Sequence, residues 1–101
     1  MPFKVSKEAT NDLREIGRYT QNKWGKAQRR RYLDDLDEKF HFLAENPQMG
    51  RRCEKIREGY FRFEFMSHIV FYKLGSEGVL ISRVLHRNRD VKAQLNKEHR
   101  E

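Results

Sequence analysis

The chain has 101 residues and a formal net charge of +7, and 12% of its residues are aromatic. This length suits one domain, and the aromatic residues lie in periodic segments, which excludes a disordered chain despite a mean hydropathy of −1.01. A single cysteine, Cys53, excludes an internal disulfide and fits a reducing compartment. No apolar stretch is long enough for a secretion signal or a membrane span, so we expect one cytoplasmic domain over residues 1–101 that does not enter a membrane.

The first half of the chain predicts a short strand and then a helix. Phe3–Val5 alternates apolar and polar residues, and Ser6 is a typical N-cap. Apolar or semi-apolar residues then recur at helical spacing: Ala9, Leu13, Ile16, Thr20 and Trp24. We place Asp12 and Glu15 outside this stripe, and Gly25 is expected to end the helix.

A second helix is predicted over residues 26–45, antiparallel to the first because the break is short. Its apolar face contains Tyr32, Leu33, Leu36, Phe40 and Leu43. Its outer face begins with arginines at 29–31 and continues with acidic residues at 34, 35, 37 and 38, an order that opposes the helix dipole. Since that order costs helix stability, it is an argument for a surface with a partner, but a solvated charged face is the favoured interpretation. Asn46 and Pro47 end the helix.

The second half predicts an antiparallel meander of three strands after an irregular connection at residues 48–59. The strand at 60–66 places phenylalanines on one face and Arg62 and Glu64 on the other. Residues 69–72 are apolar on both faces, and a hairpin at 75–78 leads to a third strand at 79–85. A short helix from Asp90 follows. The fold class is therefore α+β, with a short N-terminal strand, a helical hairpin packed on one face of the sheet, and the other face open.

The positive charge is uneven along the sequence. Residues 1–50 hold 10 basic and 8 acidic side chains, and residues 51–101 hold 12 and 7, which gives net charges of +2 and +5. We therefore expect the second half to meet an anionic partner, either a nucleic acid or an acidic protein segment.

Three arginines and one histidine gather where the last strand ends, in the sequence SRVLHRNRD. Strict alternation places Arg83 on the face of Val79, Ile81 and Leu85, and His86 on the other face. An arginine among apolar residues is more often a paired core residue than a catalytic one, and a histidine leaving a strand more often caps the core than acts as a base. Arg87 and Arg89, in the following loop, are the best candidates for binding a carboxylate or phosphate.

The sequence predicts neither a metal site nor a cofactor. The histidines at 41, 68, 86 and 99 are scattered, His68 is expected in a turn, and one cysteine cannot form a thiolate site. No glycine-rich phosphate loop or nucleophile elbow is present.

Four segments taken together resemble the ParE branch of the RelE/ParE toxin superfamily: LAENPQMGR, GYFRF, HIVFY and RVLHRNRD. The resemblance covers nearly the whole chain. It implies the toxic component of a type II toxin–antitoxin system, which inhibits DNA gyrase by protein binding without catalysis. It also implies that a ParD-like antitoxin neutralises the toxin, and that operator DNA is met only indirectly through that antitoxin.

The alternative is the RelE-like branch, ribosome-dependent nucleases that cut messenger RNA. These resemble the present chain in fold but place lysines on the first meander strand, an arginine on the middle strand and a tyrosine or similar group in the last helix. Only Arg87 matches that pattern here, so the nuclease function is the alternative.

The resemblance and the charge pattern together suggest two sets of contact residues and no catalytic residue. The expected antitoxin-binding residues are Trp24, Tyr32, Arg87 and Arg89. The expected target-binding residues are Arg62, Arg83, His86, Arg87 and Arg89.

Overall fold

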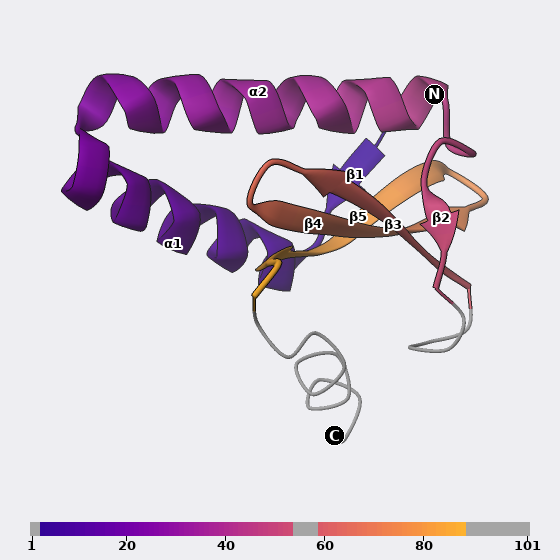
Figure 1. Cartoon of the computed structure of the whole chain (residues 1–101). Helices are drawn as coiled ribbons and strands as arrows, with labels where there is room; N and C mark the ends of the chain where they lie inside the picture. Colours follow the sequence, from indigo (N-terminus) through magenta and orange to yellow (C-terminus); the bar gives the residue numbers. More distant parts are fainter. Residues whose placement is uncertain (1–2, 54–58, 89–101) are drawn as a thin grey trace.

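The computed structural model describes residues 3–53 and 59–88 and has the predicted α+β fold (Figure 1). The elements, in chain order, are β1 (Phe3–Val5), α1 (Lys7–Trp24), α2 (Lys26–Glu45), β2 (Arg51–Arg52), β3 (Tyr60–Phe65), β4 (His68–Gly75) and β5 (Gly78–His86). The helix predicted from Asp90 lies outside the described residues. Figure 1 shows the two helices as a hairpin on one side of the sheet.

The sheet has five strands in the order β1-β5-β4-β3-β2. The predicted meander of β3, β4 and β5 is confirmed, with antiparallel pairing throughout. β1 adds to one edge and runs parallel to β5, with Phe3 opposite Val79. β2 adds to the other edge and pairs with β3. The prediction of an irregular connection over 48–59 was therefore wrong at Arg51–Arg52, because the outer edge of β3 offers backbone groups with which these two residues pair.

Local signals set the limits of both helices where they were predicted. The Ser6 hydroxyl accepts a hydrogen bond of 3.0 Å from the Ala9 N–H, which satisfies one of the free donors at the start of α1. Gly25 separates the helices with φ of 97°, a conformation that other residues rarely adopt, and its N–H donates to the Gln21 carbonyl. Neither described helix combines the length and apolar character needed to cross a membrane.

The main core lies between the helical hairpin and the sheet. Its completely buried side chains are Ala9, Leu36, Leu43, Val70, Tyr72 and Ile81. The predicted phenylalanine row of β3 packs against this core from the same face of the sheet. Trp24 does not join it, and its side chain is 60% exposed. The hairpin turn extends beyond the sheet in Figure 1, so no strand covers this end of α1.

A second apolar cluster lies on the sheet face that points away from the helices. Its buried members are Cys53, Tyr60, Ile69, Phe71 and Leu85. We had expected this face to be open and polar, and that expectation was wrong in the middle of the sheet. Burial raises the pKa of the Cys53 thiol, which keeps it protonated and unreactive at neutral pH.

Tyr72 joins the turn after α2 to the middle of the sheet. Its hydroxyl donates a hydrogen bond of 2.7 Å to the Pro47 carbonyl and accepts one of 2.9 Å from the Gly50 N–H. Gly50 is needed here for space, because a Cβ at this position would collide with the Tyr72 hydroxyl and lie 2.9 Å from the Arg62 carbonyl oxygen. Burial also raises the pKa of Tyr72, since the phenolate would lose its hydration.

Candidate functional site

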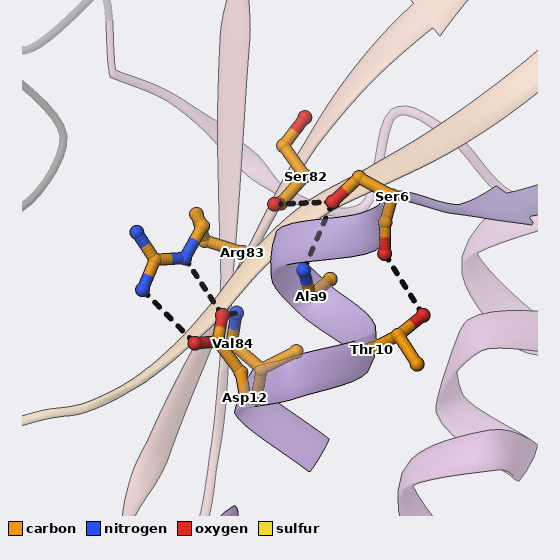
Figure 2. Close-up of polar contacts among 7 residues, drawn as sticks. All are labelled: Ser6, Ala9, Thr10, Asp12, Ser82, Arg83 and Val84. Carbon is orange, nitrogen blue, oxygen red and sulfur yellow. Dashed lines mark hydrogen bonds and ion pairs between the residues drawn. The ribbon is translucent and has the colours of Figure 1, made fainter. Parts of the chain in front are cut away.

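Arg83 is paired inside the protein with Asp12 of α1 (Figure 2). Its Nε and Nη2 atoms donate hydrogen bonds of 2.7 and 2.9 Å to the two carboxylate oxygens of Asp12. The Val84 N–H donates a third bond of 2.9 Å to the same carboxylate. β1 pairs with the edge of β5 at residues 79–81, and Asp12 of α1 provides the hydrogen-bond acceptor at the same edge for Val84.

Ser6 strengthens the same junction between the chain start and β5. Its N–H donates to the Ile81 carbonyl at 2.9 Å, and its hydroxyl donates to the Ser82 carbonyl at 2.8 Å. Figure 2 shows the bond from the Ser6 hydroxyl to the Ser82 carbonyl together with the contacts of Asp12. The prediction that Asp12 lies outside the buried stripe was wrong, because burying it satisfies both the Arg83 charge and a strand-edge donor.

A bulge changes the alternation of side chains along β5. Phe71 lies opposite Arg83 and Tyr72 lies opposite Ile81, so Ser82 is the extra residue between them. Val84 consequently joins Val79 and Ile81 in the main core, and Leu85 lies on the other face. The predicted faces were therefore wrong beyond Ser82. Arg83 is also withdrawn from the target-binding residues, because its charge is already neutralised in the interior.

His86 and His68 form a cross-strand pair at the end of the sheet, on the helix side. Their ring centroids are 5.3 Å apart, and the Tyr32 hydroxyl lies 2.6 Å from His68 Nδ1. His68 is therefore the first residue of β4 and not a turn residue as predicted. His86 Nδ1 accepts a hydrogen bond of 3.1 Å from the Asn88 N–H, as expected of a residue that caps the strand. Burial raises the pKa of Tyr32, so its hydroxyl stays protonated at neutral pH.

A surface cavity of about 440 Å³ opens beside this histidine pair. It is lined by Asp12, Glu15, Ile16, Tyr19, Val84 and Asn88 together with the two histidines. Its described lining contains apolar side chains and two carboxylates, and among these residues no nucleophile has a base beside it. Its composition suits contact with a protein side chain better than catalysis.

Three arginines surround one carboxylate on the sheet face away from the helices. Glu64 Oε1 lies 2.9 Å from Arg51 Nη2 and 3.1 Å from Arg62 Nη2. Glu64 Oε2 lies 3.7 Å from Arg87 Nη2. The arginines come from β2, from β3 and from the turn after β5. We call these four residues the Glu64 cluster. Three cations against one anion leave it with a surplus of positive charge, so it can accept a further carboxylate or phosphate.

Arg62 is the most buried arginine of the Glu64 cluster, with 25% of its side chain exposed. Its Nε is buried and has no hydrogen-bond partner within residues 3–53 and 59–88. Arg87 is half exposed, and its Nη1 donates to the Met66 carbonyl at 3.2 Å. Arg62 thus has one buried N–H without an acceptor among the described residues. Arg87 places its guanidinium at the exposed edge of the Glu64 cluster.

The residues that the structure describes do not bring together the groups that a nuclease would need. Arg62 pairs with Phe71 and shares the face away from the helices, whereas His86 pairs with His68 on the helix side. Arg87, the residue that matches the nuclease pattern, extends to Glu64 on the face away from the helices, so the sheet separates His86 from both candidate cations. Among the described residues no group of three or more histidine, cysteine or acidic side chains could hold a metal ion.

Two of the remaining predicted contact residues, Trp24 and Tyr32, lie away from the Glu64 cluster. Trp24 is at the hairpin turn, with its ring 6.1 Å from that of Tyr19, and Arg89 lies outside the described residues. Sequence reasoning missed Tyr19, Arg51 and the central role of Glu64. The pairing of Arg51 with β3 could not be seen from the sequence, because two residues are too few to give a strand pattern.

Comparison with known proteins gives a consistent set of relatives. A family model described as "ParE toxin of type II toxin-antitoxin system, parDE" matches residues 3–91. Toxin ParE1 of Caulobacter vibrioides is 38% identical over 94 residues, which cover 93% of this chain and 97% of that protein. Toxin ParE1 of Mycobacterium tuberculosis is 37% identical over 94 residues, which cover 92% of this chain and 96% of that protein.

A solved structure described as "Chromosomal ParDE TA system from P. aeruginosa" contains a chain of the same fold. The TM-score is 0.75 at 19% sequence identity, and the match covers 85% of this chain and 95% of that chain. At this identity the likeness concerns the fold alone.

Proposed function

Because the chain belongs to the ParE family of toxins from type II toxin–antitoxin systems, we propose that it inhibits DNA gyrase by protein binding and that a ParD-like antitoxin neutralises it. Inhibition by binding needs a surface that holds a partner, and it needs no acid, base or nucleophile. Gyrase and its DNA are in the cytoplasm, so the chain acts there.

The Glu64 cluster is the observation that carries this proposal. It presents a surplus of positive charge from three elements, and its two exposed arginines, Arg51 and Arg87, can reach an acceptor that a partner supplies. The absence of His86 from that face supports binding over catalysis. We therefore assign Arg62 and Arg87 to the contact with gyrase, together with Arg89, and place His86 in a structural position at the strand end.

The antitoxin is proposed to cover the helical hairpin. Trp24 and Tyr19 expose large rings there, and such rings are typical anchors of a protein interface. Tyr32 lies in the second turn of α2, half-buried beside His68. Arg87 and Arg89 would attract an acidic segment of the antitoxin. Repression of the operator is then a property of the antitoxin.

A supercoiling assay tests the gyrase proposal. Purified chain at micromolar concentration is added to gyrase and relaxed plasmid, and we expect slower supercoiling or accumulation of cleaved plasmid. The double variant Arg62→Ala/Arg87→Ala should inhibit less. The matched control is Lys4→Ala, which removes an exposed cation at the opposite edge of the sheet. Unimpaired supercoiling with the unaltered chain would overturn the proposal.

The nuclease alternative has a separate test. Messenger RNA in a translation extract should stay intact when the chain is added. Cuts at fixed codon positions that disappear in His86→Ala or Arg87→Ala would replace gyrase inhibition by ribosome-dependent cleavage.

A further inference from the structure

The end of the helical hairpin carries most of the net charge of the chain. We define the hairpin tip as residues 14–31, the last turns of α1 and the first turns of α2. It holds seven basic side chains and one acidic side chain, Glu15, a net charge of +6 against +7 for the whole chain. The basic residues are Arg14, Arg18, Lys23, Lys26, Arg29, Arg30 and Arg31. The net charge of residues 1–50 is only +2, because the acidic residues from Asp34 onward offset the positive charge of the tip.

Arginines from both helices line one depression in the tip. Arg14 and Arg18 lie one turn apart on α1, and Arg29 comes from α2. With Gln21 and Asn22 they line a hollow of about 350 Å³ that has no acidic side chain in its wall. Three guanidinium groups around a polar hollow are the arrangement that binds phosphate oxygens.

Arg29 is held in place by the packing of the two helices. Its Nη1 donates a hydrogen bond of 2.7 Å to Gln21 Oε1 across the hairpin. Its Nε lies so close to Gly17 that a Cβ there would be 2.9 Å away. The guanidinium is therefore directed into the hollow before any ligand arrives, which lowers the entropy cost of binding.

The charge of these arginines is not neutralised within the part of the chain that the structure describes. None of its ion pairs includes Arg14, Arg18 or Arg29. Arg14 contacts only a neutral group, the Asn11 amide oxygen at 3.5 Å. The first turn of α2 contains no acidic residue, so the positive end of the helix dipole adds to the same field.

Two exposed aromatic rings also belong to the hairpin tip, outside the wall of this hollow; Tyr19 lines the cavity beside the histidine pair. Tyr19 is 57% exposed and Trp24 is 60% exposed, and the Lys23 ammonium lies 5.5 and 5.3 Å from their ring centroids. Cations that follow a phosphate backbone beside aromatic rings that stack on bases are the combination found in proteins that bind single-stranded nucleic acid. An acidic peptide would satisfy the arginines but would need planar side chains of its own to stack on the rings, whereas every nucleotide carries a flat base.

We propose that the hairpin tip binds single-stranded nucleic acid, with Arg14, Arg18 and Arg29 on the phosphates and Tyr19 and Trp24 on the bases. The site is separate from the Glu64 cluster, which lies on the sheet face away from the helices. The proposal does not depend on gyrase inhibition. Because the antitoxin proposed above would cover Tyr19 and Trp24, this nucleic-acid contact belongs to the chain without its antitoxin.

Binding is measured with the purified full chain and a fluorescent oligonucleotide of about 20 nucleotides, in single-stranded and duplex form, between roughly 50 and 200 mM salt. Trp24 is the only tryptophan, so quenching of its fluorescence reports stacking without a label. We expect tighter binding of the single strand, quenching of Trp24, and a negative slope of log affinity against log salt. Arg14→Gln/Arg18→Gln/Arg29→Gln should weaken binding at least about tenfold and reduce the slope by about 2.

The matched control removes three cations from the sheet: Lys4→Gln/Arg52→Gln/Lys73→Gln. It should keep most of the affinity, and circular dichroism should show that both triple variants are folded. Tyr19→Ala/Trp24→Ala should weaken the single-strand complex more than the duplex complex. Equal losses in the two triple variants, an unchanged Trp24 signal, or displacement by a poly-glutamate peptide but not by an unlabelled oligonucleotide would overturn the proposal.

Discussion

Asp12 and Arg83, 71 residues apart in the sequence, form a buried pair with two hydrogen bonds that joins α1 to β5. The Asp12 carboxylate also accepts the Val84 N–H, so one side chain satisfies a charge and a backbone donor at the edge of a strand. Removing one member of such a pair leaves the other buried without a counter-charge.

Asp12→Ala should therefore lower the free energy of unfolding by roughly 3–5 kcal/mol. Asp12→Leu/Arg83→Met should recover part of this loss, because neither residue then carries an uncompensated charge. Urea denaturation measures both. The control is Glu15→Ala, one turn further along α1 and exposed, which should change stability by less than about 0.5 kcal/mol. A loss below about 1 kcal/mol for Asp12→Ala would show that the pair contributes little.

Gly50→Ala should destabilise the protein by roughly 1–3 kcal/mol, because the added methyl group meets the Tyr72 hydroxyl and the Arg62 carbonyl. The same substitution should cost less in a Tyr72→Phe background, where the hydroxyl is gone. Thermal unfolding of the unaltered chain, the two single variants and the double variant measures the coupling free energy between Gly50→Ala and Tyr72→Phe. Gly75→Ala is the control, since its Cβ would meet nothing closer than 3.7 Å. Equal costs at the two glycines would contradict the close approach of Tyr72.

The raised pKa of Tyr72 predicts a loss of stability at alkaline pH. A tyrosine in the unfolded chain ionises near pH 10, whereas the buried hydroxyl resists ionisation. The stabilisation is complete below about pH 10 and falls as the pH rises through the folded-state pKa, by at most about 1.4 kcal/mol per pH unit for this group. Urea midpoints at about pH 8 and pH 11 should move further apart in the unaltered chain than in Tyr72→Phe. Identical pH dependence would exclude Tyr72 as the cause.

Glu64→Gln removes the carboxylate that Arg51, Arg62 and Arg87 share. The three arginines should then attract an acidic antitoxin segment more strongly, and association should become roughly 2–5 times faster at low salt. Stopped-flow mixing at two ionic strengths measures this effect. Glu77→Gln, at the far end of the sheet beside Lys4, should leave the rate nearly unchanged. If both variants accelerate association equally, the association rate depends on the overall net charge and not on the Glu64 cluster.

Trp24→Ala should weaken the complex with the antitoxin by roughly 1–3 kcal/mol, the range for an aromatic anchor that becomes buried on binding. Calorimetry with the purified partners provides the affinity. Met49→Ala removes an apolar side chain of similar exposure, 56% against 60%, from the turn after α2. Its affinity should stay close to that of the unaltered chain, and an equal loss in both variants would mean that the hairpin turn is not the contact.

The sequence by itself determined the local elements and their limits. Ser6, Gly25 and the Asn46-Pro47 pair act through the backbone conformation and hydrogen bonding of their own neighbours, so the ends of both helices could be read directly. The alternation of β3 and the family motifs likewise depend on short stretches of chain. These signals were sufficient for the fold class and for the toxin family.

Only the tertiary structure decided which distant side chains meet. The bulge at Ser82 shifts every later residue of β5 to the other face, and no local pattern marks it, because its position depends on the pairing with β4. The partner of Arg83 and the three arginines around Glu64 come from separate elements, and their contacts exist only once those elements have packed. The hollow between Arg14, Arg18 and Arg29 has the same origin, since it needs two helices to lie side by side at Gly17.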